Sequence, residues 1–280
     1  MSASVFLAVL AAAAMHATWN AMIKVRLDPF ISIQLMSVGM GVASVPLIPF
    51  VGLPEWPSAG WAVLSAVVLH TGYKFYLTKA YEAGDLAQAY PLARGTAPLI
   101  VMGAGIALLG EKPTTLVLTG ILLLSAGTFL MSLRGSVGSF AGRAVGFALV
   151  TSVFIAGYTL IDGVGGRSAP NPLNYAVWLY IIDAIWSLLF TVAVRGRGSL
   201  RLMLPEWKIG IVAGMLSATA YAIAIWAATK APVAMVAALR ETSILFAMIL
   251  SVWMVGEKVT RWRVAAALCI VSGVVALRLG

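Results

Sequence analysis

The stretch LARGTAPLIVMGAGIALLGEK, residues 92–112, decides how this chain folds. It places Arg94 near the start of an apolar run and closes that run with Gly-Glu-Lys, in which the acid is Glu111. The run is long enough to cross a bilayer as a helix. An arginine inside such a run is costly unless its charge lines a site or is satisfied within the protein. The stretch therefore predicts a membrane helix whose arginine either lines a site or is neutralised inside the protein.

The same pattern returns near the end of the chain, as LRETSILFAMILSVWMVGEK at residues 239–258. Arg240 and Glu257 are separated by the same number of residues as Arg94 and Glu111, so one offset superposes both pairs. The match continues to the C-terminus without a gap. Two related apolar runs that each contain an arginine predict two homologous halves with a site between them.

The composition indicates an integral membrane protein. Of the 280 residues, 61% are hydrophobic and 10% are charged, and the mean hydropathy is +0.97. A soluble domain carries about 25% charged residues, so this chain has too little polar surface to stay in water. The apolar blocks do not alternate with polar residues, which predicts helices and not the strands of a barrel. The length allows about ten membrane helices with short loops.

Prolines, glycines and short polar stretches mark the ends of the expected helices. These cover residues 3–24, 29–51, 59–80, 86–109, 114–133, 143–163, 173–194, 207–229, 232–255 and 260–278. The first is expected to be retained, because it lacks the basic start of a signal peptide. The expected fold class is an all-α integral membrane protein with ten transmembrane helices in two five-helix repeats.

The two repeats are expected to be inverted. The Gly/Ser-rich residues 135–142 form the expected linker between a first repeat at 1–134 and a second at 143–280. Because five is an odd number, equivalent helices would enter the membrane from opposite sides, as in many secondary carriers. Lysine and arginine residues are concentrated in the loops after the odd-numbered helices. The positive-inside rule would place that side in the cytoplasm and both termini outside.

These features resemble the drug/metabolite transporter superfamily, specifically two EamA domains. The resemblance is carried by the Gly-Glu that ends the fourth and ninth helices, by a glycine in each following helix, and by Trp19-Asn20 with Lys24 and Pro91-Leu92 with Pro98. It implies transport of small metabolites by alternating access, through a cavity lined by the first, third, fourth, sixth, eighth and ninth helices. It also implies cytoplasmic termini, opposite to the charge distribution, so the orientation stays open. The segments HATWN and YPLARGTAPL faintly resemble permeases associated with phosphonate utilisation.

Charged residues deep in the expected helices are the first candidates for a site. Arg94 and Arg240 would approach the centre from opposite faces, and guanidinium groups suit carboxylate or phosphate. Alternatively, they are structural arginines neutralised by internal acids such as Glu241 or Asp183. Glu241 corresponds to Gly95 in the first half, and it is a candidate for proton coupling. Asp183 is a second proton-coupling candidate, and either acid could instead hold a helix in place.

A polar and aromatic stripe in the first helix is a further candidate for the cavity wall. His16, Trp19 and Asn20 share one face, because they are spaced at i, i+3 and i+4. A histidine in a helix is more often a packing residue than a ligand. Its polar and aromatic companions favour a position in the substrate-binding cavity here.

The third helix carries a similar cluster of His70, Tyr73 and Lys74. Lys74 could line the cavity or extend along the helix to the membrane surface. Tyr158 and Tyr221 are candidates for aromatic walls of the substrate site. An aromatic residue in a membrane helix is more often part of the core or of the interface belt, so a packing role remains the alternative for both.

Other kinds of site are not indicated by the sequence. Glu111 and Glu257 end their helices and are each followed by lysine, which favours a structural role in the turns. Cys269 is the only cysteine, and no metal-ligand spacing, cofactor motif or serine–histidine pair stands out. We therefore expect no metal, no cofactor and no catalysis. The net charge of +9 comes mostly from residues between helices, which indicates control of topology and not nucleic-acid binding.

The favoured function is secondary active transport of a small polar metabolite. The deep cations are Lys74, Arg94 and Arg240. The deep acids are Asp183 and Glu241, so the cavity would keep a net positive charge. Such a cavity favours a substrate with an anionic group, such as an amino acid or an organic anion. Protons are the candidate coupling ion.

Alternative functions use the same residues differently. The chain could export aromatic or cationic drugs with Trp19, Tyr73 and Glu241. An intramembrane enzyme that modifies lipids, with His16 or His70 as the base, is a remote alternative, and so is a scaffold without transport. The expected setting is a multi-pass protein of the plasma membrane, with a bacterial inner membrane favoured, as a monomer or weak dimer.

Overall fold

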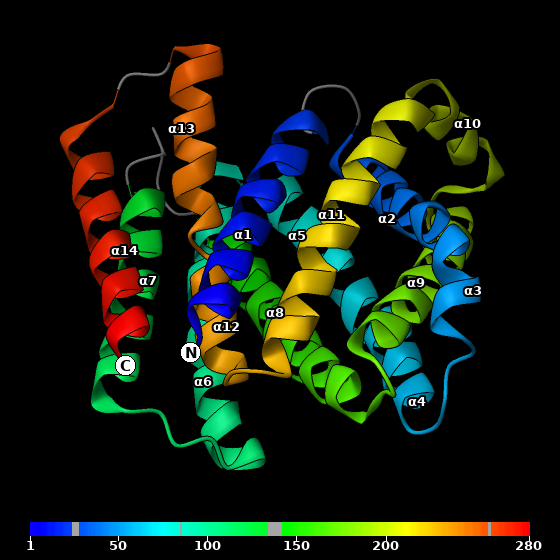
Figure 1. The fold of residues 1–280 in the computed structure, drawn as a ribbon. Helices are drawn as coiled ribbons and strands as arrows, with labels where there is room; N and C mark the ends of the chain where they lie inside the picture. Colours follow the sequence, from blue (N-terminus) through cyan, green and yellow to red (C-terminus); the bar gives the residue numbers. More distant parts are fainter. Residues whose placement is uncertain (24–27, 85, 134–141, 257–258) are drawn as a thin grey trace.

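The fold is built from helices packed side by side (Figure 1). The structure is a computed structural model of residues 1–280, and it describes all of them except 24–27, 85, 134–141 and 257–258. Within these described residues there is no β-strand. The expected all-helical fold class is confirmed.

In the first half, helical segments lie close to the expected positions. They are α1 (Ala3–Ile23), α2 (Pro29–Ser44), η1 (Val45–Leu47), α3 (Ile48–Val51), α4 (Ser58–Leu64), η2 (Ser65–His70), α5 (Thr71–Ala83), α6 (Leu86–Leu109) and α7 (Thr115–Leu133). The start of α2 follows from local chemistry, because the Asp28 side chain accepts a hydrogen bond from the Ile31 amide at 3.0 Å. Pro29 takes the first helical position, where an amide hydrogen is not needed.

The second half repeats this order with two departures from expectation. Its elements are α8 (Gly142–Ser168), α9 (Pro172–Arg195), η3 (Arg197–Ser199), α10 (Leu200–Met203), η4 (Leu204–Glu206), α11 (Trp207–Ala228), α12 (Val233–Arg240), α13 (Ser243–Val255) and α14 (Arg261–Leu279). Helix α8 continues past its expected end at residue 163, and the expected ninth helix is divided into α12 and α13. Most of the expected linker, 135–141, lies outside the described residues.

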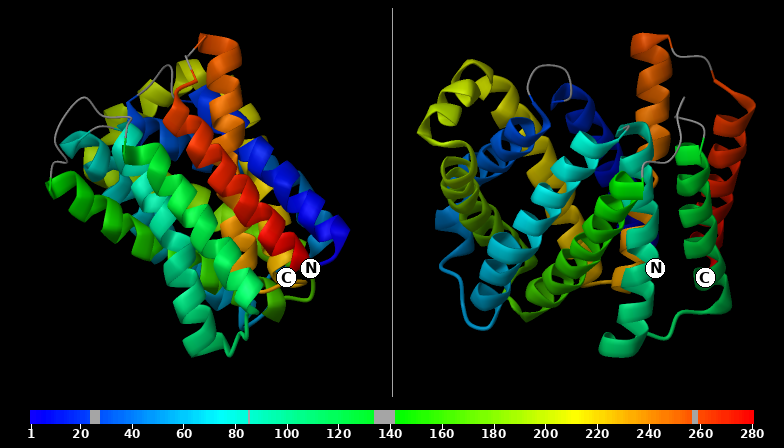
Figure 2. Two further views of the ribbon diagram at one scale, coloured as in Figure 1. Left: turned by 90° about the vertical axis from the view of Figure 1, so that its left-hand side faces the viewer. Right: turned by 180° about the vertical axis from the view of Figure 1, so that it is seen from behind.

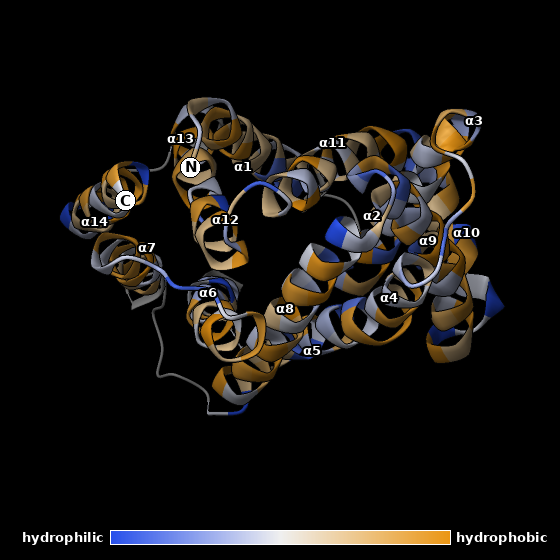
Figure 3. Ribbon diagram, turned by 60° about the horizontal axis from the view of Figure 1, so that its bottom comes forward, coloured by the Kyte–Doolittle hydropathy of each residue, from blue (hydrophilic) through white to orange (hydrophobic). Residues whose placement is uncertain are grey.

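The membrane-spanning character is clear for most of these segments. Among the described residues, eight helical runs are long and apolar enough to cross a bilayer, and Thr115–Met131 is a shorter apolar helix. The run from α4 to α5 is helical but is not among the eight. Length and hydropathy therefore support a multi-pass membrane protein without establishing all ten expected crossings. Figure 3 shows apolar residues along the helices and hydrophilic residues gathered at several helix ends and connections.

The two halves pack with an approximate two-fold relationship. The first helix of each half packs on the third helical segment of the other half, as α1 on α11 and α8 on α5. The second helices α2 and α9 pack on each other, and so do the last helices α7 and α14. In Figures 1 and 2, α1 and α8 run in opposite directions. This arrangement fits a two-repeat architecture whose equivalent helices are inverted.

Glycines let helices from the two halves approach closely. A Cβ atom added to Gly39 of α2 would lie 2.0 Å from the carbonyl oxygen of Gly210 in α11. One added to Gly214 would lie 2.3 Å from the carbonyl carbon of Gly39. The backbones therefore touch here, as is common where membrane helices associate.

Two irregular turns interrupt the helices beside the centre of the molecule. The residues of η2 form a π-helical turn that ends at His70, and π-turns are frequent at functional sites. Between α12 and α13, the Glu241 and Thr242 amides bond to carbonyls three residues back, those of Ala238 and Leu239. Both irregular turns adjoin the cavity described next.

Candidate functional site: a polar cavity between the two halves

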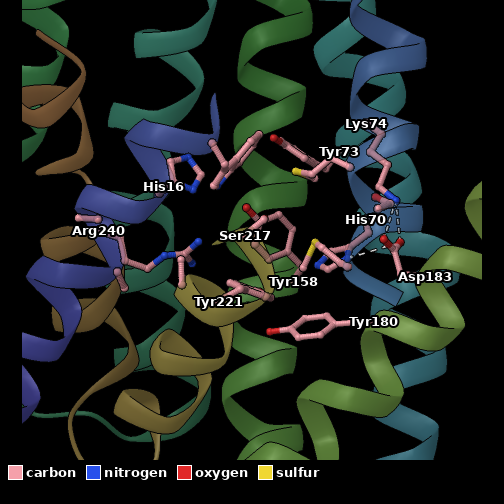
Figure 4. A pocket seen from close by; sticks show the side chains of 17 residues that line it. His16, His70, Tyr73, Lys74, Tyr158, Tyr180, Asp183, Ser217, Tyr221 and Arg240 are labelled. Atoms are coloured by element: carbon pink, nitrogen blue, oxygen red, sulfur yellow. Dashed lines mark hydrogen bonds and ion pairs between the residues drawn. The ribbon is translucent and has the colours of Figure 1, made fainter. Parts of the chain in front are cut away.

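A cavity of about 70 Å³ lies between the halves and is lined by both of them. Its residues come from α1, α2, η2 and α5 in the first half and from α8, α9, α11 and α12 in the second. Figure 4 shows His16 and Arg240 on one side and His70, Lys74 and Asp183 on the other, with tyrosine rings between them. Polar groups thus converge in a protein that is otherwise apolar.

Lys74 and Asp183 form a buried ion pair across the halves. The Lys74 ammonium donates to both carboxylate oxygens of Asp183, at 2.7 and 2.8 Å, and to the Ser187 hydroxyl at 2.8 Å. Both charged side chains are almost fully buried, with exposures of 5% and 6%. Lys74 therefore lines the cavity and does not extend to the membrane surface. Asp183 is thus neutralised by this lysine and not by an arginine.

His70 lies between two carboxylates from different helices. Its Nε2 atom is 3.5 Å from an oxygen of Asp162 in α8, and its Nδ1 atom is 3.7 Å from an oxygen of Asp183 in α9. The ring packs edge-on against Tyr158, with centroids 4.8 Å apart. His70 thus links an acid on each side of the cavity wall.

Asp162 is the main polar residue that sequence reasoning missed. Tyr175 donates its hydroxyl to one oxygen of Asp162 at 2.7 Å, and the Tyr221 hydroxyl donates to the other. Asp162 is almost fully buried. Because α8 was expected to end at residue 163, this acid was placed at a helix end, although it lies more than a turn inside the helix.

Arg94 and Glu241 join the two repeat-related helices. The Arg94 Nη2 atom is 3.0 Å from one Glu241 oxygen, and its Nε atom donates to the other at 3.1 Å. Both side chains are about 95% buried. They line a smaller pocket that shares Arg240 with the central cavity. Glu241 thus neutralises Arg94 and not its neighbour Arg240.

Arg240 is the cavity cation whose charge is not matched. Its guanidinium carbon lies 4.7 Å from the centre of the Tyr221 ring, and the residue is half-buried. Among the described residues it makes no ion pair and no hydrogen bond. Lys74 and Arg94 each have a carboxylate partner. Arg240 therefore presents a guanidinium that is available to a ligand.

The charge balance of the site differs from the sequence expectation. Lys74 with Asp183, and Arg94 with Glu241, make neutral pairs. Asp162 adds a third acid without pairing with Arg240, so the summed charge of these groups is zero while the histidines are neutral, and the expected net positive charge is not present. The positive charge is instead localised, because Asp162 is held by tyrosines and His70 while Arg240 faces open space.

The predicted polar and aromatic stripe on α1 lies partly in the cavity and partly in a hydrogen-bonded cluster around Tyr90. His16 and Trp19 line the cavity and meet edge to face, with ring centroids 4.9 Å apart. A His16 ring nitrogen lies 3.2 Å from the Tyr90 hydroxyl, and Asn20 donates to the same hydroxyl at 3.3 Å. Asn20 is not among the lining residues of the central cavity. Its predicted contact with substrate therefore has no support from this arrangement.

The predicted aromatic residues meet around the cavity. Tyr73 and Tyr158 are packed edge to face at 5.6 Å, and Tyr158 meets Tyr221 at 6.0 Å. All three line the cavity. Tyr180, which the sequence did not single out, closes another side and donates its hydroxyl to the Ala218 carbonyl at 3.1 Å. The cavity is thus lined by aromatic rings.

Of the two acids in the Gly-Glu-Lys turns, Glu111 and Glu257, only Glu111 lies within the described residues. Glu111 accepts a hydrogen bond from the Val233 amide at 2.7 Å, at the first residue of α12. Arg167 lies 4.0 Å from the same oxygen. These contacts agree with the expected structural role. Glu257 lies outside the described residues. Within the described residues, no group of three or more His, Cys, Asp and Glu is arranged to hold a metal ion.

Two packed helical halves around a buried polar cavity define a multi-pass membrane protein of the transporter class. Residues 3–133 and 142–279 each match the EamA-like transporter family. The protein therefore belongs to the EamA-like transporter family, with two EamA domains of the drug/metabolite transporter superfamily. It is a membrane transporter of that type.

A solved structure shares the fold. One crystal structure matches this chain with a TM-score of 0.78 and 18% sequence identity, and the match covers 100% of this chain and 98% of that chain. At this identity the likeness concerns the fold alone. Comparison with curated proteins finds no match.

Proposed function

We propose that this protein is a secondary transporter of a small polar metabolite with an anionic group, such as an amino acid or an organic anion. Arg240 binds the anionic group in the cavity between the halves. The observation that carries this proposal is the guanidinium of Arg240, which faces the cavity without a carboxylate partner among the described residues. A carboxylate or phosphonate can accept two parallel hydrogen bonds from it.

The energetics of a charge at this depth support a role for Arg240. Ionisable residues within membrane segments are costly and usually paired. The neighbouring cations follow this rule through Asp183 and Glu241. The ring of Tyr221 stabilises the Arg240 charge in part, because a desolvated cation–π contact contributes about 2 kcal/mol. An anionic substrate would complete the neutralisation.

The helix irregularities support alternating access as the mechanism. Arg240 ends α12 at the break before α13, and His70 ends the π-turn η2 on the facing side. In carriers built from inverted repeats, discontinuous helices supply the binding groups near the membrane centre. One half would rock against the other around the site. The tyrosines would then keep contact with an apolar part of the substrate.

Export of aromatic or cationic drugs is the second candidate, and the aromatic walls favour it. Trp19 and Tyr73 line the cavity as that reading requires. Its acid, Glu241, is engaged by Arg94 and does not line the central cavity. A cationic substrate would also approach the unmatched charge of Arg240. The anionic substrate is therefore preferred.

A thermal-shift screen on purified protein in detergent tests the proposal. The compounds are paired, each carboxylate or phosphonate with its uncharged amide or ester and with the related amine. We expect acids to raise the unfolding temperature and their neutral partners to have no effect. Arg240→Gln should remove the shift, whereas Arg201→Gln, at an exposed arginine of α10, should keep it.

Uptake then connects binding with transport. The acid with the largest thermal shift is supplied in radiolabelled form to proteoliposomes. Accumulation above that of empty liposomes, lost in Arg240→Gln, is the expected result. Equal stabilisation by amines and acids, or uptake that is unchanged in Arg240→Gln, would reject the anion site and favour the drug exporter. Turnover of lipid without flux would instead favour an enzyme.

A further inference from the structure

His70 occupies a position that no simple packing role explains. It ends the π-turn of η2, its side chain is 12% exposed, and its two ring nitrogens face oxygens of Asp162 and Asp183 at 3.5 and 3.7 Å. We propose that His70, held between these two acids, is the proton-binding site that couples to the anion site at Arg240. The proposal rests on the transport function proposed above and names its coupling ion.

The neutral and the protonated imidazole differ in how many hydrogen bonds they can donate, and this difference favours a proton on His70. A neutral histidine has one N–H donor and one acceptor nitrogen, whereas the protonated ring has two donors. An ionised carboxylate only accepts. With carboxylates at both nitrogens, the neutral ring would point a lone pair at one of them. Asp162 also accepts from two tyrosines and Asp183 from Lys74, and the His70 distances of 3.5 and 3.7 Å are those of ion pairs. Only the protonated ring directs an N–H toward each of the two acids, so this geometry favours a bound proton.

The remaining groups around His70 do not supply a competing proton donor for both acids. From its own run, α5 contributes Lys74, which is engaged with Asp183 and Ser187. The other titratable and charged groups facing it are Asp162 and Tyr158 from α8, Asp183 from α9 and Tyr221 from α11. The packed helix α4 contributes none. The proton on His70 therefore decides whether the imidazole can pair with Asp162 and Asp183 at the same time.

A metal cation is a poorer candidate than a proton for this place. Sodium would need several oxygen ligands, and here the imidazole fills the space between the carboxylates. Asp183 is further occupied by the ammonium of Lys74. The described residues also contain no cluster of acids and histidines that is arranged for a metal. A proton needs no such cage.

Tyr221 connects the proton site to the proposed anion site. Its hydroxyl donates to Asp162, and the Arg240 guanidinium lies 4.7 Å from the centre of its ring. Asp162 thus shares its charge among His70, Tyr175 and Tyr221. An anion that draws Arg240 away from Tyr221 would change the hydrogen bond from Tyr221 to Asp162. That change would alter the affinity of His70, beside Asp162, for its proton. By linkage, the proton would alter anion affinity by the same factor.

The chain offers a direct test because it has only two histidines. Purified protein labelled with ¹⁵N-histidine is titrated in detergent by NMR, which reports the protonation of each ring nitrogen. The His16→Gln variant assigns the signals. We expect both nitrogens of His70 to carry protons in one state and a single deprotonation to end it. Asp162→Asn and Asp183→Asn should each move the midpoint to lower pH, by about one unit or more.

His16 supplies an internal reference in the same spectra, because its ring nitrogen contacts the Tyr90 hydroxyl. A His70 midpoint that is unchanged in both asparagine variants would overturn the proposal. So would a wild-type ring that holds one unprotonated nitrogen throughout the range in which the protein is folded, a measurement that needs no variant. The titration uses no substrate. A failure of the flux assays would therefore count against the transport proposal and leave the proton site standing.

Discussion

Arg94 and Glu241 form a two-point ion pair that ties the first half of the chain to the second, with distances of 3.0 and 3.1 Å. Arg94 has Arg240 as its counterpart under the repeat, and Glu241 stands one residue further, where the first half has Gly95. A Cβ atom at Gly95 would lie 3.0 Å from the Thr128 side chain. A larger side chain at this position would crowd Thr128, and the first half has no acid there that could pair with Arg240. This asymmetry leaves Arg240 available.

Breaking the Arg94–Glu241 pair should destabilise the fold strongly. Arg94→Ala leaves a carboxylate buried without its partner, and such single removals lower stability by about 3–5 kcal/mol. Arg94→Ala with Glu241→Ala should lose much less than the sum of the two single variants, because no unpaired charge remains. Unfolding titrations in detergent measure all three. Additive losses would show that the two residues are not energetically coupled.

Glu111 should stabilise the start of α12 by accepting from the Val233 amide at 2.7 Å. An amide at the first helical position has no partner within its own helix. Glu111→Ala should lower the free energy of unfolding by about 1 kcal/mol, as for a lost helix cap. Glu111→Gln keeps an oxygen acceptor and should lose less. Equal losses in the two variants would indicate that the negative charge, beside Arg167, matters more than the hydrogen bond.

The contact between α2 and α11 should not tolerate a methyl group. A Cβ atom at Gly39 would lie 2.0 Å from a backbone oxygen of Gly210, so Gly39→Ala must separate the helices. Overpacking of this kind destabilises by about 1–3 kcal/mol. Gly146 is a matched control, because it is also helical and a Cβ atom there meets nothing within 4 Å. Gly146→Ala should stabilise the helix by about 0.5–1 kcal/mol.

Some of this site follows from the sequence, because the repeat offset identifies positions. The common spacing marked Arg94 and Arg240, and the helical spacing of His70 and Lys74 placed them on one face. The pairing of Glu241 was not predictable in the same way. Neighbours on a helix point about 100° apart, so Glu241 cannot share the direction of Arg240. Which residue meets it depends on how the other half packs, and a single sequence does not contain that packing directly.

Asp162 was missed for a different physical reason. The expected helix ended at residue 163, among the glycines that follow Asp162, but in α8 these glycines are packing positions inside the helix. A Cβ atom at Gly165 would lie 2.2 Å from the Tyr175 ring, and one at Gly166 would lie 2.6 Å from the Ile225 side chain. Small residues are enriched where membrane helices pack closely. A helix continued to Ser168 would have shown Asp162 as a buried acid.

Substitution at Arg240 should separate charge from geometry in anion binding. Arg240→Lys keeps the positive charge but loses the planar two-point contact. A charge-assisted hydrogen bond contributes about 1.5–3 kcal/mol, so affinity for the acid found in the thermal-shift screen should fall by about tenfold or more. The affinity of Arg240→Gln for the same acid should fall further, because this variant also loses the positive charge. Isothermal titration measures both. Equal affinity in Arg240→Lys and wild type would mean that the anion is recognised as a point charge alone.

Transport driven by a pH gradient should depend on His70, whereas exchange should not. Histidine is the side chain that ordinarily gains or loses its proton between about pH 5 and 8. In His70→Gln, proteoliposomes should lose accumulation of substrate under an imposed pH gradient but retain counterflow of labelled against unlabelled substrate, which needs no proton. Tyr221→Phe should weaken the coupling while it keeps the ring against Arg240. If gradient-driven accumulation survives in His70→Gln, the coupled proton binds at another residue, with Glu241 and Asp183 as the remaining candidates. Loss of counterflow as well would show that His70 is needed for the transport cycle itself.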